Sequence, residues 1–139
     1  MIYVMGWNAR VLDVRGKITY IFNETHQLKV SVLAVLEPKQ PADRINVFGK
    51  HMGLCRLMSN NSYSQSIWVF WKREAEVEKV EASSQHITTK VKIGCYEVFI
   101  SFVYASNDIS VRKDLWWSLG CFSPGNSAWV VARDFNTVG

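Results

Sequence analysis

Short apolar runs of strand length recur along this chain, and they restrict the folds that it can adopt. The runs occupy residues 2–8, 30–37, 67–71, 86–93, 93–104 and 128–136. They are rich in valine, isoleucine and aromatic residues, which fit the pleated, partly buried surface of a sheet. None approaches the roughly 20 consecutive apolar residues that a membrane-spanning helix needs. The sequence therefore predicts a soluble protein built on β-sheet, with no membrane as a partner.

Helical periodicity separates some of these runs. Residues 17–28 place apolar side chains three and four positions apart, and residues 110–122 do the same between a candidate cap at Ser110 and a stop at Gly120. A shorter helix is expected near residues 42–48. Because strand-helix units are mixed with hairpins, we expect an α/β (α+β) protein whose sheets carry helices on their outer faces.

The middle of the chain is predicted to form antiparallel sheet. Residues 86–93 alternate apolar and polar side chains, and a tight turn at Gly94 returns the chain into the next strand. His86 falls on the polar side of this alternation, so we expect its side chain to be exposed. The mixed charges of residues 72–81 predict a solvated loop or an edge strand, and the polar residues 59–66 predict a loop.

The composition is that of an ordinary globular domain. Of the 139 residues, 48% are hydrophobic and 20% are charged, which argues against wholesale disorder. The net charge of +4 is compatible with a phosphate-rich partner but is too small to identify one. Cys55, Cys95 and Cys121 lie far apart with no CxxC pair, so we interpret them as buried thiols in a reducing compartment. The first residues show no secretory leader, and we expect an intracellular protein of the nucleus or cytoplasm.

Six tryptophans are spread over several of the predicted elements. Aromatic side chains that gather on one surface are typical of proteins that stack the bases of single-stranded nucleic acid. Because the tryptophans of this chain are dispersed, we interpret them as core residues.

Polar side chains stand where four of the predicted strands end. They are Asn8, Glu37, the stretch from Tyr104 to Asn107, and Asp134 with Asn136. Asp134 and Asn136 lie on the same side of an extended strand, because successive side chains point to opposite faces. A single carboxylate in an open polar cleft suits Mg²⁺, which keeps several waters and is completed by substrate phosphate. Glu37 is therefore the candidate ligand, and the remaining residues are candidates for binding phosphate and activating water.

Each of these residues also has a purely structural interpretation. Asp134 and Asn136 bond readily to nearby backbone and can close the last strand as a turn. Asn8 can serve as a turn residue, Glu37 as a solvated carboxylate, and Asn107 as the start of the helix that follows. Tyr104 is expected to bury its ring and to leave its hydroxyl in water.

Four motifs occur in order along the chain. They are WNAR at 7–10, LAVLEPK at 33–39, VYASN at 103–107 with Arg112 and LW after it, and RDFNTV at 133–138. Together they resemble the motifs of the endonuclease/exonuclease/phosphatase family, which includes DNase-I-like and apurinic endonucleases. In wording and spacing they are most similar to the N-terminal endonuclease domain of plant LINE-type (non-LTR) retrotransposons.

The resemblance implies a DNase-I-like four-layer α-β-β-α sandwich with a phosphodiesterase site at one end. The cofactor would be Mg²⁺ or Mn²⁺ and the partner would be DNA. Asn8 and Glu37 would help to bind the metal, and Tyr104, Asn107 and Arg112 would line the phosphate site. By the same resemblance, Asp134 would act on the attacking water and Asn136 would orient the water or the phosphate.

The chain also departs from the pattern of that family. It ends at Gly139, before the late aspartate and histidine pair that the family needs for cleavage, and Arg133, Val11 and Pro38 replace residues of the motifs. We therefore expect residues 1–139 to be the N-terminal part of one such domain, retroelement-derived and inactive as this fragment. Two alternatives are a non-catalytic module that binds nucleic acid and a retrotransposon remnant without function.

Overall fold

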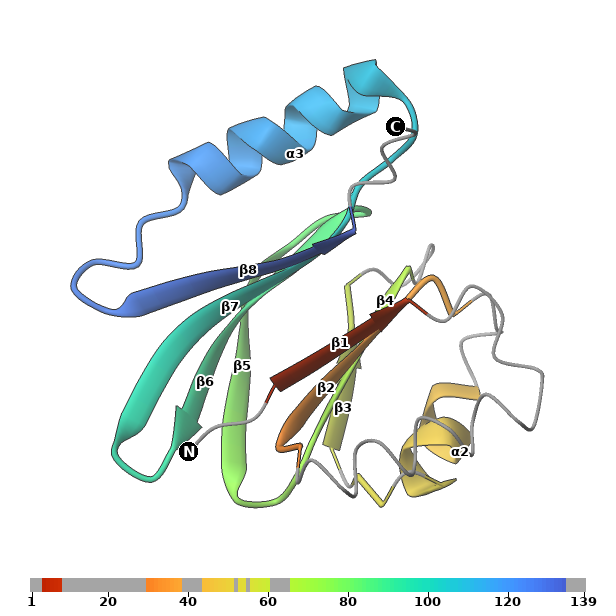
Figure 1. Ribbon diagram of the computed structural model, residues 1–139, viewed down its shortest axis with the longest axis vertical. Helices are drawn as coiled ribbons and strands as arrows, with labels where there is room; N and C mark the ends of the chain where they lie inside the picture. Colours follow the sequence, from red (N-terminus) through yellow and green to blue (C-terminus); the bar gives the residue numbers. More distant parts are fainter. Residues whose placement is uncertain are drawn as a thin grey trace.

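Two four-stranded sheets lie face to face in this protein (Figure 1). The structure is a computed structural model that describes residues 4–8, 30–38, 44–51, 53–54, 56–60 and 66–134. The first sheet has the order β1-β2-β4-β3 and contains Val4–Asn8 (β1), Val32–Leu36 (β2), Arg56–Ser59 (β3) and Ile67–Trp71 (β4). The second has the order β5-β6-β7-β8 and contains Ala75–Ala82 (β5), His86–Ile93 (β6), Tyr96–Tyr104 (β7) and Ala128–Asp134 (β8).

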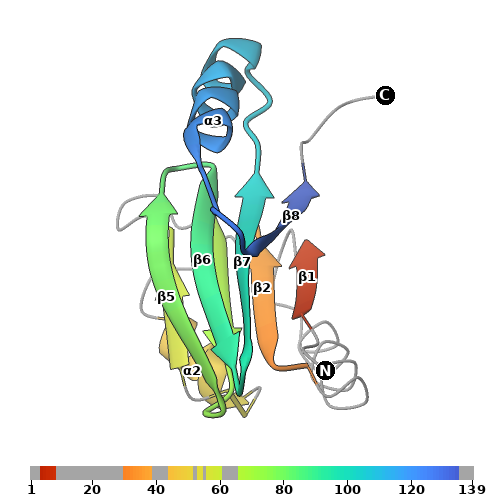
Figure 2. The same cartoon turned by 90° about the vertical axis from the view of Figure 1, so that its left-hand side faces the viewer.

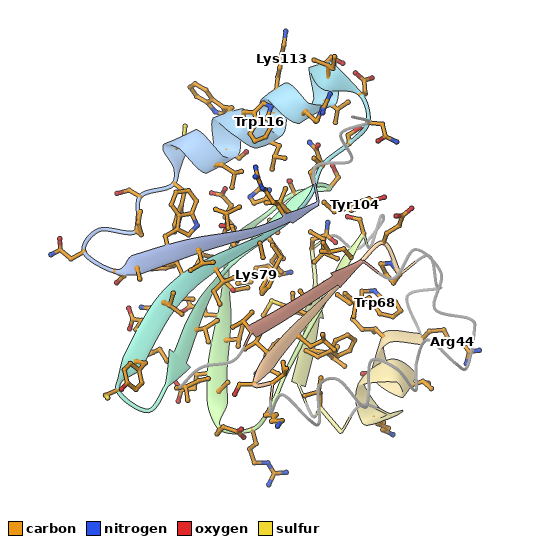
Figure 3. All side chains as sticks on the ribbon, viewed as in Figure 1. Arg44, Trp68, Lys79, Tyr104, Lys113 and Trp116 are labelled. Carbon is orange, nitrogen blue, oxygen red and sulfur yellow. The ribbon has the colours of Figure 1, made fainter. Side chains whose placement is uncertain are left out.

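The first sheet is buried on both faces at its centre. Every residue of β2 and of β4 is buried, as the unbroken apolar sequences VLAVL and IWVFW require. The helix α2 (Arg44–His51) covers the outer face, where Ile45 joins a cluster with Trp68 and Phe70. Figure 3 shows Trp68 on the side of the sheet that faces α2.

The main core lies between the two sheets. Apolar side chains from both inner faces pack together there, and they include Val32, Ala34, Ile67, Val69, Ile87, Val91, Ile100 and Phe102. Because each strand presents alternate residues to this layer, sheet pairing and core packing select the same register.

The second sheet contains the predicted hairpin. β6 and β7 pair antiparallel through a two-residue connection, in which Gly94 adopts the left-handed backbone conformation (φ 60°) that favours glycine. β7 and β8 are parallel, so the chain needs a crossover, and the helix α3 (Ile109–Cys121) supplies it. Leu115 of α3 packs against Val103 on the outer face of the sheet. With α2 on one side and α3 on the other, the predicted four-layer sandwich is confirmed (Figure 1).

The prediction that His86 is exposed is wrong. Its side chain is 1% exposed, and the neighbouring outward position, Thr88, is fully buried. The alternation of residues 86–93 is correct, but α3 and the segment that leads into it cover the end of the outer face on which both residues lie. A polar residue on an outward face can be buried when another layer covers that face and its hydrogen bonds are still made. Here the sheet itself supplies them, from Ser83 and Glu81 to His86 and from Ser101 to Thr88.

Two other burial predictions need correction. Cys95 and Cys121 are exposed, because the first lies in the hairpin turn and the second ends α3; the side chain of Cys55 lies outside the described residues. Trp68 and Trp71 are core residues as expected, whereas Trp116 and Trp117 of α3 are 49% and 74% exposed.

Helix boundaries follow the sequence closely. The predicted helix 110–122 is α3, although its cap is Asp108 rather than Ser110, and it ends one residue after Gly120. α2 overlaps the short helix expected near 42–48, and the edge strand expected within 72–81 is β5. β3 was not predicted.

The helix expected at 17–28 lies outside the described residues. Within the described part of the chain, no helix is long and apolar enough to cross a membrane.

An apolar groove opens where the edges of the two sheets meet. β1 and β8 lie at the same edge of the sandwich (Figure 2), and the groove between them has a volume of about 360 Å³. It is lined by Val4, Gly6, Val98, Ile100, Val130 and Ala132. Val130 belongs to the inner face of β8 and is nevertheless 53% exposed.

Candidate functional site

The strand ends that carry the predicted polar residues meet at one end of the sandwich. Asn8 is the register partner of Leu36, so β1 ends beside the residue that precedes Glu37. Tyr104 is the register partner of Asp134 in the second sheet. Figure 3 shows Tyr104 at the end of the sandwich toward which β1 and β8 both point.

Hydrogen bonds join the two sheets at this end. The side-chain amide of Asn60, which follows β3, donates to the carbonyl of Ser83 at 2.8 Å. The hydroxyl of Ser66, which precedes β4, donates to the carbonyl of Ser84, also at 2.8 Å. Because the N–H of Glu37 donates to the carbonyl of Ser66 and the N–H of Tyr104 to the carbonyl of Gln85, the ends of β2 and β7 meet the same polar edge.

Glu37 has an unusual backbone conformation. Its φ of 55° lies in the left-handed region, which costs an L-residue other than glycine about 1–2 kcal/mol. Its main-chain N–H donates to the carbonyl of Ser66 at 2.8 Å, and its side chain is half-buried. Pro38, which follows, is buried. Residues held in such conformations cluster at functional sites, where the surrounding structure offsets the strain.

The segment after β7 is fixed at both of its ends. Tyr104 is half-buried with its ring against the inter-sheet core, as the sequence predicted, and its main-chain N–H donates to the carbonyl of Gln85 at 2.8 Å. Asn107 is exposed immediately before the helix. Asp108 caps α3 by accepting the N–H of Ser110 at 2.9 Å, and the N–H of Arg112 donates to the carbonyl of Asp108 at 3.0 Å.

The cap gives this segment its clearest electrostatic feature. The hydroxyl and then the main-chain N–H of Ser110 donate to the Asp108 carboxylate and hold its pKa below the ordinary value of 3.8. Asp108 is therefore ionised at neutral pH, directly beside the exposed Asn107. A negative charge at a helix N-terminus is also favoured by the helix dipole.

The remaining candidates are described in part. The strands place the backbones of Asn8 and Asp134 at the common edge, whereas their side chains lie outside the described part of the structure. Asn136 lies outside it altogether. Glu37, Tyr104, Asn107 and Arg112 are the predicted site residues whose side chains are described.

Several residues at this edge were missed by the sequence analysis. Gln85, Asn60 and Ser66 belong to a polar network that links the two sheets, and Gln85 is 5% exposed. They stand in short polar stretches between strands, where a loop is the natural interpretation. No spacing in the sequence distinguishes a buried glutamine of this kind from a solvated one.

A metal ion at this edge would have few protein ligands. Among the described residues, no three histidine, cysteine, aspartate or glutamate side chains come together in a way that could hold a metal ion. Mg²⁺ does not need such a cluster, because it binds through one or two carboxylates and keeps waters that phosphate oxygens can replace. The half-buried carboxylate of Glu37 at a polar edge fits this mode of binding.

Comparison with known proteins identifies the fold. A scan against protein-family models and a search of curated proteins found no match to this chain. Among solved structures, D. rerio TDP2 in complex with a single-strand DNA product superposes with a TM-score of 0.69, at 10% identity over 99% of this chain and 62% of TDP2. Truncated Caenorhabditis elegans TDP2 matches with a TM-score of 0.57, at 18% identity over 93% of this chain and 59% of that protein.

A third structure that is similar is the endonuclease domain of TRAS1, a telomere-specific non-LTR retrotransposon. It has a TM-score of 0.60, at 11% identity over 86% of this chain and 52% of the domain. The chain thus spans between half and two thirds of the length of these three structures. The similarity confirms that the chain has the DNase-I-like fold predicted from its four motifs.

Proposed function

We propose that this chain carries the metal-binding and phosphate-binding residues of a phosphodiesterase site that acts on DNA. The observation that carries the proposal is the strand register, which brings the end of β1 beside Glu37 and the end of β8 beside Tyr104. The left-handed backbone of Glu37 adds support, because strain of this kind is retained where the residue has a role beyond stability.

The residues divide into two roles. Glu37 and Asn8 would hold Mg²⁺ or Mn²⁺, which supplies positive charge to phosphoryl oxygens as they gain negative charge. Tyr104, Asn107 and Arg112 would donate hydrogen bonds to the phosphate and hold it in place. Asp134 would accept a proton from the attacking water, and Asn136 would orient that water or the phosphate.

Structural neighbours support DNA as the substrate. One of them, D. rerio TDP2, was solved with a single-strand DNA product, and another is a retrotransposon endonuclease domain. The order and wording of the four motifs lead us to propose a retroelement origin, with plant LINE endonucleases as the related group.

Nicking of supercoiled plasmid tests the proposal directly. The purified chain is incubated with Mg²⁺ or Mn²⁺, with EDTA as the blank, and compared with Glu37→Ala and Asp134→Ala. Glu97→Ala serves as the matched control, because this carboxylate lies on the hairpin at the opposite end of β7 and pairs with Lys90 at 3.6 Å. Metal-dependent nicking that both site variants lose and the control retains would support the proposal, and it would overturn the expectation that residues 1–139 are inactive by themselves. A soluble, folded chain that shows neither nicking nor Mg²⁺-dependent binding of DNA would contradict the proposal.

Binding without cleavage is the second candidate function, and one observation favours it. Trp117 is 74% exposed on α3, and Lys113, one turn earlier, points away from the sandwich (Figure 3). An exposed indole beside a cation is suited to stacking a base and contacting a phosphate. Salt-sensitive binding of a labelled oligonucleotide, weakened by Trp117→Ala and without any nicking, would favour this function over the first.

A further inference from the structure

A three-residue turn connects both parts of the candidate site. Ser83, Ser84 and Gln85 join β5 to β6. Toward the first sheet, the carbonyls of Ser83 and Ser84 accept from Asn60 and Ser66, and the carbonyl of Ser66 in turn accepts the N–H of Glu37. The turn is thus two hydrogen bonds away from the strained residue that is proposed to hold the metal.

Toward the second sheet, Gln85 makes three hydrogen bonds. Its main-chain carbonyl accepts the N–H of Tyr104, and its side-chain oxygen accepts the N–H of Ser106, both at 2.8 Å. Its side-chain nitrogen donates to the carbonyl of Val111 in the first turn of α3 at 2.9 Å. The oxygen and the nitrogen of the Gln85 side chain therefore hold the segment that contains Asn107 on both sides.

Further hydrogen bonds, which involve Glu81 and His86, hold the turn in place. The hydroxyl of Ser83 accepts the N–H of Gln85 at 3.1 Å and lies 2.6 Å from Nδ1 of His86. Nε2 of His86 lies 3.0 Å from the carboxylate of Glu81, which requires a proton on that nitrogen. Glu81, His86, Ser83 and Gln85 are thus joined in one continuous series of hydrogen bonds.

We propose that Gln85 is the positioning residue that sets the phosphate-binding segment at a fixed place relative to Glu37. The inference rests on the function proposed above. It assigns the Ser83–Gln85 turn a part in that site that neither the motifs nor the comparisons give it. Gln85 touches neither the metal nor the phosphate, and it acts through Ser106 and α3.

Substitutions at Gln85 separate positioning from general stability. Gln85→Leu removes both side-chain hydrogen bonds, and Gln85→Asn, one methylene shorter, is the milder variant if the leucine does not fold. Gln85→Glu keeps an acceptor for the Ser106 N–H but removes the donor to the Val111 carbonyl, so it should loosen α3 while the bond to Ser106 remains. Thr89→Val is the matched control, because it removes a buried hydrogen bond from β6, the strand that follows Gln85, to the carbonyl of Ile100 (2.9 Å) away from the site.

Two measurements are made on each variant. Hydrogen exchange of the Ser106 amide should be about tenfold faster in Gln85→Leu and Gln85→Asn, and unchanged in Thr89→Val. The Mg²⁺ concentration needed for half-maximal binding of a labelled single-stranded oligonucleotide should rise about tenfold in the two loosening variants. It should stay within about twofold of wild type in Thr89→Val.

The outcomes distinguish this inference from the proposed function. If the wild-type chain shows no Mg²⁺-dependent binding, the proposed function fails. The hydrogen exchange of the Ser106 amide alone then supports or overturns the positioning of this segment by Gln85. If the wild type binds and the loosening variants bind equally well, the positioning role is overturned while the function stands. Equal effects in Thr89→Val would also overturn it, because they would show that stability alone is responsible.

Discussion

The main-chain N–H of Glu37 donates to the carbonyl of Ser66 at 2.8 Å while the backbone of Glu37 stays in the left-handed region at φ 55°. The hydrogen bond keeps Glu37 beside β4 after its own strand has ended. Glycine would adopt this conformation without strain. Glutamate at this position is therefore less stable than glycine would be, but it places a carboxylate at the polar edge.

Replacing Glu37 should separate stability from function. Glu37→Gly and Glu37→Ala both remove the carboxylate, but only glycine relieves the left-handed backbone. We expect the glycine variant to be more stable than the alanine variant by about 1 kcal/mol in urea unfolding. Both should lose Mg²⁺-dependent DNA binding. Equal stabilities of the two variants would show that the backbone at this position is unstrained.

The cap of α3 should make stability depend on pH in acid. Hydrogen bonds from Ser110 lower the pKa of Asp108 in the folded protein below 3.8. A lowered folded pKa contributes stability that is fully present above the unfolded value and is lost as pH falls through the folded one.

Asp108→Asn tests this expectation, because it keeps an acceptor for the N–H of Ser110 but does not titrate. The melting temperature of the wild type should exceed that of Asp108→Asn at pH 7 and fall toward it below about pH 3.8. Asp108→Ala should be the least stable of the three at pH 7. A gap between wild type and Asp108→Asn that is constant from pH 7 to 2.5 would contradict the assignment.

The attachment of α3 depends on one buried side chain. Leu115 is 1% exposed and packs against Val103 and Ala105. Leu115→Ala should lower the free energy of unfolding by about 2–5 kcal/mol. Val111→Ala, at a position 38% exposed on the same helix, is the control and should cost far less. A cooperative wild-type melt in the same experiment would argue against a remnant that has lost its fold.

The open edge of β8 should promote self-association. Within the described residues no strand pairs with the outer edge of β8, and Val130 is 53% exposed in the apolar groove. Charged residues on such edges discourage pairing between molecules. We expect Val130→Lys to reduce light scattering of concentrated protein, whereas Val80→Lys on the opposite edge strand should leave it unchanged. Equal scattering by the two variants would assign the association to another surface.

Local sequence patterns carried a large part of the architecture. The apolar runs predicted β1, β2, β4 and β6 to β8, and Gly94 predicted the hairpin turn, because strand periodicity and a positive φ are properties of a few consecutive residues. β3 was missed because four residues with weak alternation carry too little signal. The positions of Glu37 and Tyr104 at strand ends were also visible, and the parallel register then placed the strand ends at one edge.

Local patterns were sufficient to locate most of the strands and the polar residues at their ends. Three features depend instead on the three-dimensional arrangement: the burial of His86, the left-handed backbone of Glu37 and the hydrogen bonds from Gln85 to the segment before α3. Each of these depends on a partner from a distant part of the chain: the layer formed by α3, the carbonyl of Ser66 and the amide of Ser106. Periodicity reports which face a side chain occupies, whereas burial and hydrogen bonding depend on what covers that face.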